Sequence, residues 1–170
     1  MASRALSVIV SLLFTLFGGP GILLVAVPWW ITRFRLPEAA PLWRIFAGAV
    51  LIAAGLIPLL ESIWRFVVVG RGTLVPAVPT ERLVVSGLYR YVRNPMYVGV
   101  VTAIAGEALL FWNRGMAEEL VFVFLAMQLF VLMYEEPKLR GTYPKEYPRY
   151  CRNVRRWIPR LTAWDGGGLQ

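Results

Sequence analysis

The sequence predicts an all-α membrane protein with about four transmembrane helices, the first kinked or hairpin-like, and an amphipathic carboxy-terminal helix. Of its 170 residues 58% are hydrophobic, and the mean hydropathy is +0.59. A soluble domain of this size could not bury so many apolar side chains. Long apolar stretches alternate with short polar segments, and nothing marks a second domain. We therefore expect one domain over 1–164, with a helical pair at 1–69, a core at 70–160 and a flexible tail at 165–170.

The first apolar stretch covers residues 5–31 and is interrupted by the cluster Gly18-Gly19-Pro20-Gly21. Arg4 followed by an apolar run also has the pattern of a signal peptide. Because apolar residues continue beyond the cluster, we expect a membrane helix kinked there, since neighbouring helices can satisfy the freed backbone groups. A hairpin of two half-spans is the alternative.

Three further apolar stretches cover residues 45–69, 95–112 and 115–134, and the first of them is long enough to cross a bilayer with some tilt. We expect all three to be membrane spans. Glu61 and Arg65 lie four residues apart in the first of these. That spacing places the two charges on one helix face, where we expect them to form an ion pair.

The cations are distributed unevenly between the two sides of a four-span arrangement. One side carries fourteen Lys and Arg residues, in the amino terminus, residues 65–93 and the tail, whereas the other side carries four. This bias predicts cytoplasmic termini. A fifth span would remove the bias. The net charge of +8 lies beside apolar segments, which predicts contact with anionic lipid head groups and not with nucleic acid. Sixteen Arg against two Lys suggest a GC-rich bacterial genome, and therefore a bacterial inner membrane.

The chain has no His and a single Cys, Cys151. It therefore lacks the commonest general base, and no cluster of His and Cys residues predicts a metal site. An intrachain disulfide is excluded.

The stretch GLYRYVRNPMYVG at 87–99 places many hydrogen-bonding groups at the edge of a membrane span. Asn94 is predicted to cap the following helix and Pro95 to start it, because proline suits the first helical position. Arg93 then stands beside a helix amino terminus, and both favour an anion. Alternatively, these residues are ordinary interfacial anchors.

Glu135 and Glu136 follow the fourth apolar stretch, at what we expect to be the carboxy-terminal end of its helix. The helix dipole disfavours anions there, so the pair requires cations or hydrogen-bond donors. Arginines of the tail or loop would suffice. If the third and fourth helices are antiparallel, however, the pair faces Arg93 and Asn94. A zwitterionic ligand such as an amino-acid cofactor would satisfy both halves.

The tail contains an aromatic stripe with helical spacing, and Pro144 and Pro148 fit only before or in the first turn of such a helix. We expect the helix to fold over the polar site as a lid, with an interfacial helix lying on lipid as the alternative. The stripe consists of Tyr143, Tyr147, Tyr150, Val154 and Trp157.

Four segments together resemble the isoprenylcysteine carboxyl methyltransferase and phospholipid methyltransferase group. They are GRGTLVP (70–76), LVVSGLYRYVRNPMYVG (83–99), YEEPKL (134–139) and EYPRYCRNVRRWIP (146–159). The group consists of small integral-membrane enzymes that use S-adenosylmethionine. An Arg-x-Pro-x-Tyr block, a hydrophobic span and a Glu pair in this order are specific, whereas each alone would be weak.

The resemblance implies a site for S-adenosylmethionine between the last helices and the tail, with S-adenosylhomocysteine as the product. Arg93, Glu136 and Glu107 are the predicted catalytic residues. Glu107 is included because a carboxylate within a membrane span is costly and could serve as a base, although a structural hydrogen bond would also explain it. The predicted cofactor-binding residues are Tyr89, Arg93, Asn94, Pro95, Tyr97, Glu135, Glu136 and Tyr147.

The expected reaction is methyl transfer to a lipophilic acceptor that enters from the bilayer. NPMY at 94–97 is closer to the phospholipid branch, and the carboxyl branch usually has His at the position of Asn94. EYPRY and RWIP in the tail are closer to the carboxyl branch. Methylation of a carboxylate is our first expectation and methylation of a lipid amine the second. A small transporter and a non-enzymatic membrane scaffold are the competing classes.

Overall fold

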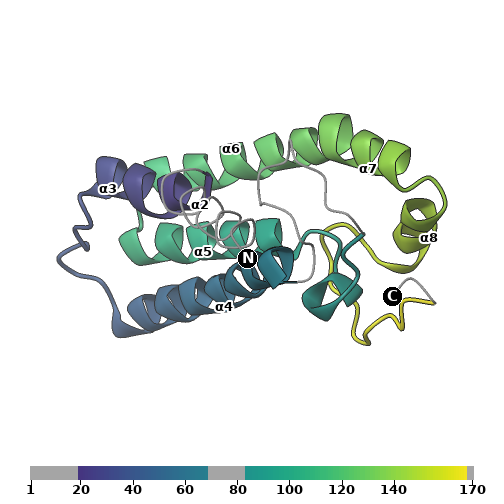
Figure 1. Cartoon of the computed structure of the whole chain (residues 1–170). Helices are drawn as coiled ribbons and strands as arrows, with labels where there is room; N and C mark the ends of the chain where they lie inside the picture. The colour runs from purple at the N-terminus through teal and green to yellow at the C-terminus, as the bar shows by residue number, and fades with distance from the viewer. Residues whose placement is uncertain (1–18, 69–82, 168–170) are drawn as a thin grey trace.

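The computed structural model describes residues 19–68 and 83–167, and this part of the chain is helical and contains no strand. Three long helices lie side by side with the middle one antiparallel to its neighbours, and a short amino-terminal helix packs on them (Figure 1). The tail folds at one end of this bundle. Residues 1–18, 69–82 and 168–170 lie outside the described part. They include the first half of the first predicted apolar stretch, most of the 70–94 loop and the end of the predicted flexible tail.

The helix at the start of the described chain runs from Gly19 to Thr32 as α2 (Gly19–Gly21), a π-helical turn η1 (Ile22–Ala26) and α3 (Val27–Thr32). The Val27 N–H donates to the carbonyl of Ile22, five residues back. Pro28 follows directly and has no N–H, so the regular hydrogen-bond pattern cannot continue through it. A wider turn accommodates the proline without ending the helix.

Helices α4 (Leu42–Val68) and α5 (Pro95–Phe111) pack in close antiparallel contact through two glycine pairs. A Cβ atom on Gly55 would lie 2.5 Å from the carbonyl oxygen of Gly99, and one on Gly106 would lie 2.7 Å from that of Gly48. The two glycines on each helix are seven residues apart, or about two turns. The backbones therefore touch along a continuous seam, as small residues permit in membrane helices.

The fourth helix is longer than predicted. It consists of α6 (Arg114–Phe130), a π-helical turn η3 (Val131–Glu135) and α7 (Glu136–Thr142), which form one apolar run. The Glu136 N–H donates to the carbonyl of Val131, directly before Pro137. The expectation that the Glu pair ends a helix was therefore wrong, because the π turn absorbs the proline and the helix continues to Thr142.

The tail helix is shorter than predicted. After the short 3-10 helix η2 (Gly87–Arg90), the only other described helix outside the bundle is α8 (Glu146–Asn153), which includes Pro148 in its first turn as expected. Val154 is extended, so Val154 and Trp157 do not continue the helical stripe. The residues of the predicted stripe are in two different places. Tyr147, Tyr150 and Val154 pack together with Trp164, whereas Trp157 lies beside Tyr97 of α5 and Phe124 of α6.

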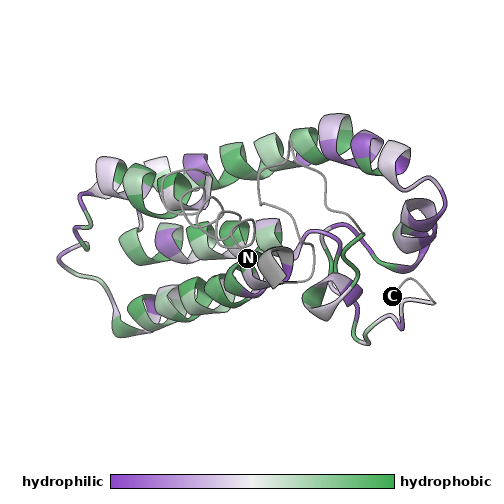
Figure 2. Ribbon diagram, viewed as in Figure 1, coloured by the Kyte–Doolittle hydropathy of each residue, from purple (hydrophilic) through white to green (hydrophobic). Residues whose placement is uncertain are grey.

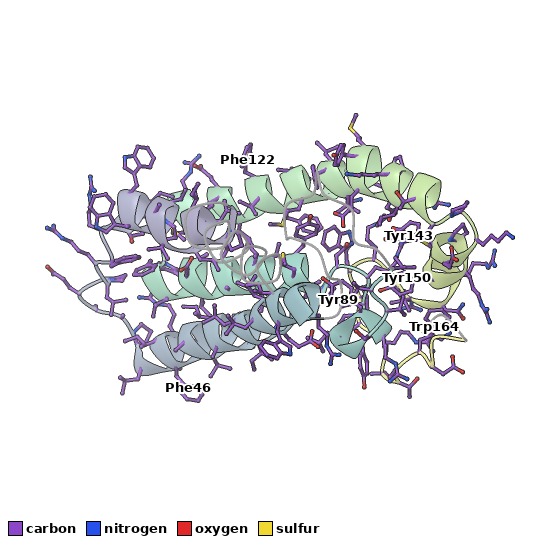
Figure 3. All side chains as sticks on the ribbon, in the orientation of Figure 1. Phe46, Tyr89, Phe122, Tyr143, Tyr150 and Trp164 are labelled. Atoms are coloured by element: carbon purple, nitrogen blue, oxygen red, sulfur yellow. The ribbon has the colours of Figure 1, made fainter. Side chains whose placement is uncertain are left out.

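Two helical segments are long and apolar enough to cross a membrane, Leu42–Arg65 and Arg114–Thr142, whereas Gly19–Thr32 and Pro95–Phe111 are shorter. Only 22% of the most apolar window of each long segment is buried inside the protein. Their apolar side chains therefore point outward, and Phe46 and Phe122 are examples (Figure 3). The helices are mostly hydrophobic and the loops and tail more hydrophilic (Figure 2). An outward-facing apolar surface of this extent fits a bilayer.

The glycine seam yields a matched pair of substitutions. Gly55→Ala places a methyl group against the Gly99 backbone, and we expect it to lower the free energy of unfolding by about 1–3 kcal/mol. Gly141→Ala in α7 meets nothing within 4 Å and should not destabilise the protein. Thermal unfolding in detergent compares the two variants. Equal midpoints would show that α4 and α5 do not touch at Gly55.

Candidate active site

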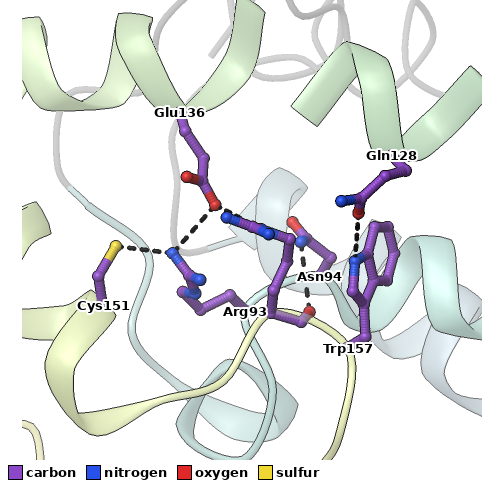
Figure 4. A network of polar contacts seen from close by, with 7 residues as sticks. Arg93, Asn94, Gln128, Glu136, Cys151 and Trp157 are labelled. Carbon is purple, nitrogen blue, oxygen red and sulfur yellow. Dashed lines mark hydrogen bonds and ion pairs between the residues drawn. The ribbon is translucent and has the colours of Figure 1, made fainter. Parts of the chain in front are cut away.

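A buried ion-pair network joins the start of α5, the start of α7 and the tail (Figure 4). The Glu136 Oε1 atom lies 3.1 Å from Nη1 of Arg93 and 2.7 Å from Nε of Arg156. The side chains of Glu136 and Arg93 are 9% and 11% exposed. The hydrogen bond to Glu136 also raises the pKa of the Arg156 guanidinium. A carboxylate in this position compensates two cations at once, so the network holds the tail against the helices.

Backbone contacts fix the tail beside the amino terminus of α5. The Arg93 N–H donates to the carbonyl of Arg155 (2.9 Å), and Nδ2 of Asn94 donates to the carbonyl of Arg156 (3.3 Å). Asn94 occupies the cap position and Pro95 starts the helix, as predicted. The Asn94 side chain forms no capping hydrogen bond to the helix, and its Nδ2 group donates to the tail. The capping hydrogen bond was therefore wrongly predicted.

Glu135 has a different environment from Glu136. Its Oε2 atom accepts a hydrogen bond from the Tyr97 hydroxyl (3.0 Å). Among the described residues, no ion pair to Glu135 is formed. The two neighbouring carboxylates thus divide into one that arginines compensate and one that a neutral hydroxyl holds in place.

Three buried tyrosines lie near the network, Tyr89 before α5 and Tyr147 and Tyr150 in the tail helix α8. The Tyr150 hydroxyl donates to the carbonyl of Tyr89 (2.6 Å), and Tyr147 is 3% exposed. Burial raises the pKa of all three hydroxyls, so they stay protonated at neutral pH. They therefore contribute hydrogen-bond donors and shape, and no charge. Figure 3 shows Tyr89, Tyr143, Tyr150 and Trp164 at the end of the bundle where the tail folds.

The structure brings most of the predicted site residues to one end of the bundle, but not Glu107. Glu107 is buried in α5, twelve residues after Pro95, or about 18 Å along the helix axis. Its charged neighbour is Glu119 of α6, which is buried as well. The ion pair expected between Glu61 and Arg65 is confirmed at 2.6 Å.

Three residues that join the network or its surroundings were not among the predicted site residues: Arg156, Cys151 and Gln128. Arg156 was one of several arginines in the tail, and its spacing did not distinguish it. The Cys151 Sγ atom accepts a hydrogen bond from Nη1 of Arg93 (2.7 Å). Gln128 Oε1 accepts one from the Trp157 indole N–H (2.6 Å). A signal was available for Gln128, because it is the only side chain between residues 120 and 133 with hydrogen-bonding groups.

Part of this site lies in a segment of the chain that matches a known family. The family model described as Phospholipid methyltransferase matches residues 43–146, which is more than half of the chain. The chain belongs to the phospholipid methyltransferase family. No curated protein and no solved structure gives a significant match.

The family match covers the chain from the beginning of α4 to the first residue of α8. It therefore includes Arg93, Tyr97, Glu135 and Glu136, whereas Arg156 and Trp157 lie beyond it. Membership supports a membrane methyltransferase, in agreement with the outward-facing apolar helices. Within the described residues, no group of three or more His, Cys, Asp or Glu side chains could hold a metal ion.

Removing the Glu136 charge should loosen the tail. Glu136→Gln leaves two largely buried arginines without a compensating carboxylate, which costs on the order of 3 kcal/mol. Limited trypsin digestion in detergent should then cleave after the exposed residues Arg152 and Arg155 at least tenfold faster than in wild type.

Glu118→Gln is the matched control, because the Arg114–Glu118 pair is exposed and contributes little. If Glu136→Gln and Glu118→Gln are cleaved at the same rate, Glu136 does not hold the tail.

Proposed function

We propose that the protein is an integral-membrane methyltransferase that uses S-adenosylmethionine to methylate a lipophilic acceptor from the bilayer. The arrangement of Glu135 carries this proposal. Arg93 and Arg156 are both engaged by Glu136, so Glu135, held by the Tyr97 hydroxyl, is left to face a cationic or hydroxyl-bearing ligand. The cofactor carries an ammonium, a sulfonium and ribose hydroxyls, and each can satisfy a carboxylate.

The same site offers an anion-binding half. Helix α5 begins at Pro95, directly after Asn94, so its first free N–H groups and its dipole favour a negative charge there. Nε of Arg93 is buried without a hydrogen-bond partner in the described structure. A carboxylate near this atom would satisfy it. Together the two halves fit the zwitterionic amino-acid part of the cofactor.

The bound cofactor would supply the methyl group, and the protein would position the two reactants and exclude water. Displacement at a methyl group is sensitive mainly to the alignment and separation of the reacting atoms. The tail lies against the network, with its own Tyr147 and Tyr150 buried, so it would restrict access from the aqueous side. The acceptor then has to approach from the side of the membrane helices.

Charge balance favours a carboxylate as the acceptor. Two arginines and two glutamates at the site sum to zero net charge, and the cofactor adds one positive charge. A carboxylate acceptor would neutralise that charge in a site of low dielectric constant, whereas an amine would not. An amine would also have to lose a proton first, and Glu135 is the carboxylate at the site that arginines do not already engage.

Several exposed cations support an orientation with the tail in the cytoplasm, facing anionic lipid. The bilayer would attract them to the surface from which the acceptor enters. In this arrangement the protein crosses a bacterial inner membrane several times. The exposed cations of the tail are Lys145, Arg149, Arg152 and Arg155.

Calorimetry with S-adenosylhomocysteine in detergent tests the cofactor site. We expect wild type to bind and Glu135→Gln to bind about 10- to 100-fold more weakly, because a hydrogen bond to a charged group is lost. Glu118→Gln, at the other end of α6, should bind as wild type does. Absence of binding by folded wild-type protein would reject the cofactor proposal.

Arg93→Lys tests whether the guanidinium geometry is needed. Lysine keeps the charge but cannot present several fixed N–H groups to Glu136, Cys151 and a ligand together. We expect transfer of labelled methyl groups from S-adenosylmethionine into a membrane lipid extract to fall at least tenfold. Arg114→Lys, in an exposed pair, is the control. Unchanged transfer would make Arg93 an interfacial anchor only.

A further inference from the structure

Gln128 is a polar residue in the most apolar part of the fourth helix. An amide at this depth is costly unless its groups find partners. The π turn η3 lies between Gln128 and Glu136 and adds one residue to the ordinary spacing of about seven for two turns. Gln128 therefore lies near the helix face of Glu136, about two turns further into the bundle. Both residues contact the tail, Glu136 through Arg156 and Gln128 through Trp157.

The contact with Trp157 fixes which end of the amide remains available. An indole N–H can only donate, so its partner at 2.6 Å has to be the amide oxygen. The amide nitrogen, with two N–H groups, is then the end left over. In the described structure this nitrogen has no hydrogen-bond partner, and in Figure 4 it points toward the side where Asn94 and Glu136 lie.

The Trp157 ring is itself held in place. Its centroid lies 5.6 Å from that of Phe124 and 6.4 Å from that of Tyr97, whose hydroxyl reaches Glu135. The preceding residue, Arg156, is bound by Glu136 and by the Asn94 amide. The amide of Gln128 therefore cannot turn over unless it gives up a hydrogen bond from a fixed partner.

We propose that Gln128 binds an oxygen atom of the methyl acceptor through its amide N–H groups, and that Trp157 is the positioning residue that fixes this orientation. The inference rests on the proposed function and adds the chemistry of the acceptor. N–H groups select an oxygen with lone pairs, from a carboxylate or a phosphate, and they disfavour an ammonium group. Phe124 is 38% exposed and Leu125 and Leu129 are more so, which leaves an apolar surface for the chain of such an amphiphile.

Photolabelling of the protein loaded with S-adenosylhomocysteine tests this proposal. Three probes share one long alkyl chain with a diazirine next to the head group, which is a carboxylate, a phosphate monoester or an amine. We expect the carboxylate or the phosphate probe to label the region of Gln128 and Trp157 saturably, and at least tenfold more than the amine probe. Mass spectrometry of peptides locates the label, and the two oxygen probes distinguish the sources.

Gln128→Met keeps the shape of the side chain and removes both amide groups, so labelling by the preferred oxygen probe should fall roughly tenfold. Trp157→Phe keeps an aromatic ring but frees the amide to present either end, so the preference for oxygen over amine should shrink. Neither change removes a group proposed to bind the cofactor, and the affinity for S-adenosylhomocysteine should stay within threefold. Phe122→Met, on the exposed face of α6, is the control.

A merely structural role for Trp157 would change the labelling by all three probes together and leave their ratio intact. Equal labelling of wild type by the amine and oxygen probes, or unchanged labelling in Gln128→Met, would overturn the inference. Cofactor calorimetry of wild type stands apart from these outcomes: binding with no preference for oxygen rejects only the role of Gln128, whereas no binding rejects the cofactor site itself.

Discussion

Glu136 binds two arginines that reach it from different parts of the chain, and the geometry of the site depends on this carboxylate. Arg93 comes from the loop before α5 and Arg156 from the tail. Their charges would repel each other at this separation without an anion between them. With Glu136 in place, the tail can lie against the start of α5, where Asn94 and the Arg93 N–H hold its backbone. The tail and the proposed cofactor site thus depend on the same carboxylate.

Pro137 follows Glu136 directly, and the local structure that it causes recurs at Pro28 in the amino-terminal helix. Pro28 and Pro137 each follow a π-helical turn, and in both cases the residue before the proline donates to a carbonyl five residues back. The extra residue rotates everything that follows on the helix. In the fourth helix Glu136 faces the arginines and Glu135 faces Tyr97. Gln128 and Glu136 are eight residues apart, which would leave them about 80° apart around a regular helix, and the π turn brings them closer to one line along the helix.

The features that depend only on neighbouring residues in the sequence were predicted correctly. The beginning of α5 at Asn94 and Pro95 follows from the restricted backbone around proline, and the Glu61–Arg65 pair follows from helical spacing. The end of the fourth helix could not be predicted from such a rule. The π turn accommodates Pro137, and the helix continues to Thr142. Arg156 could not be selected from the tail arginines, because its partner depends on a chain path that no local pattern encodes.

The tail after α8 contacts both the ion-pair network and the apolar helices. Consecutive residues there have different contacts: Arg155 is exposed, Arg156 compensates a buried carboxylate, and Trp157 enters between α5 and α6. The chain leaves the helix at Val154, whose backbone is extended, and bends over residues 156–158, so these side chains are not confined to one helix face. The helical stripe expected over residues 143–157 requires a continuous helix, whereas the chain leaves the helix at Val154. On the path that it takes instead, the Trp157 indole N–H donates to the amide oxygen of Gln128, and the proposed orientation of that amide rests on this contact.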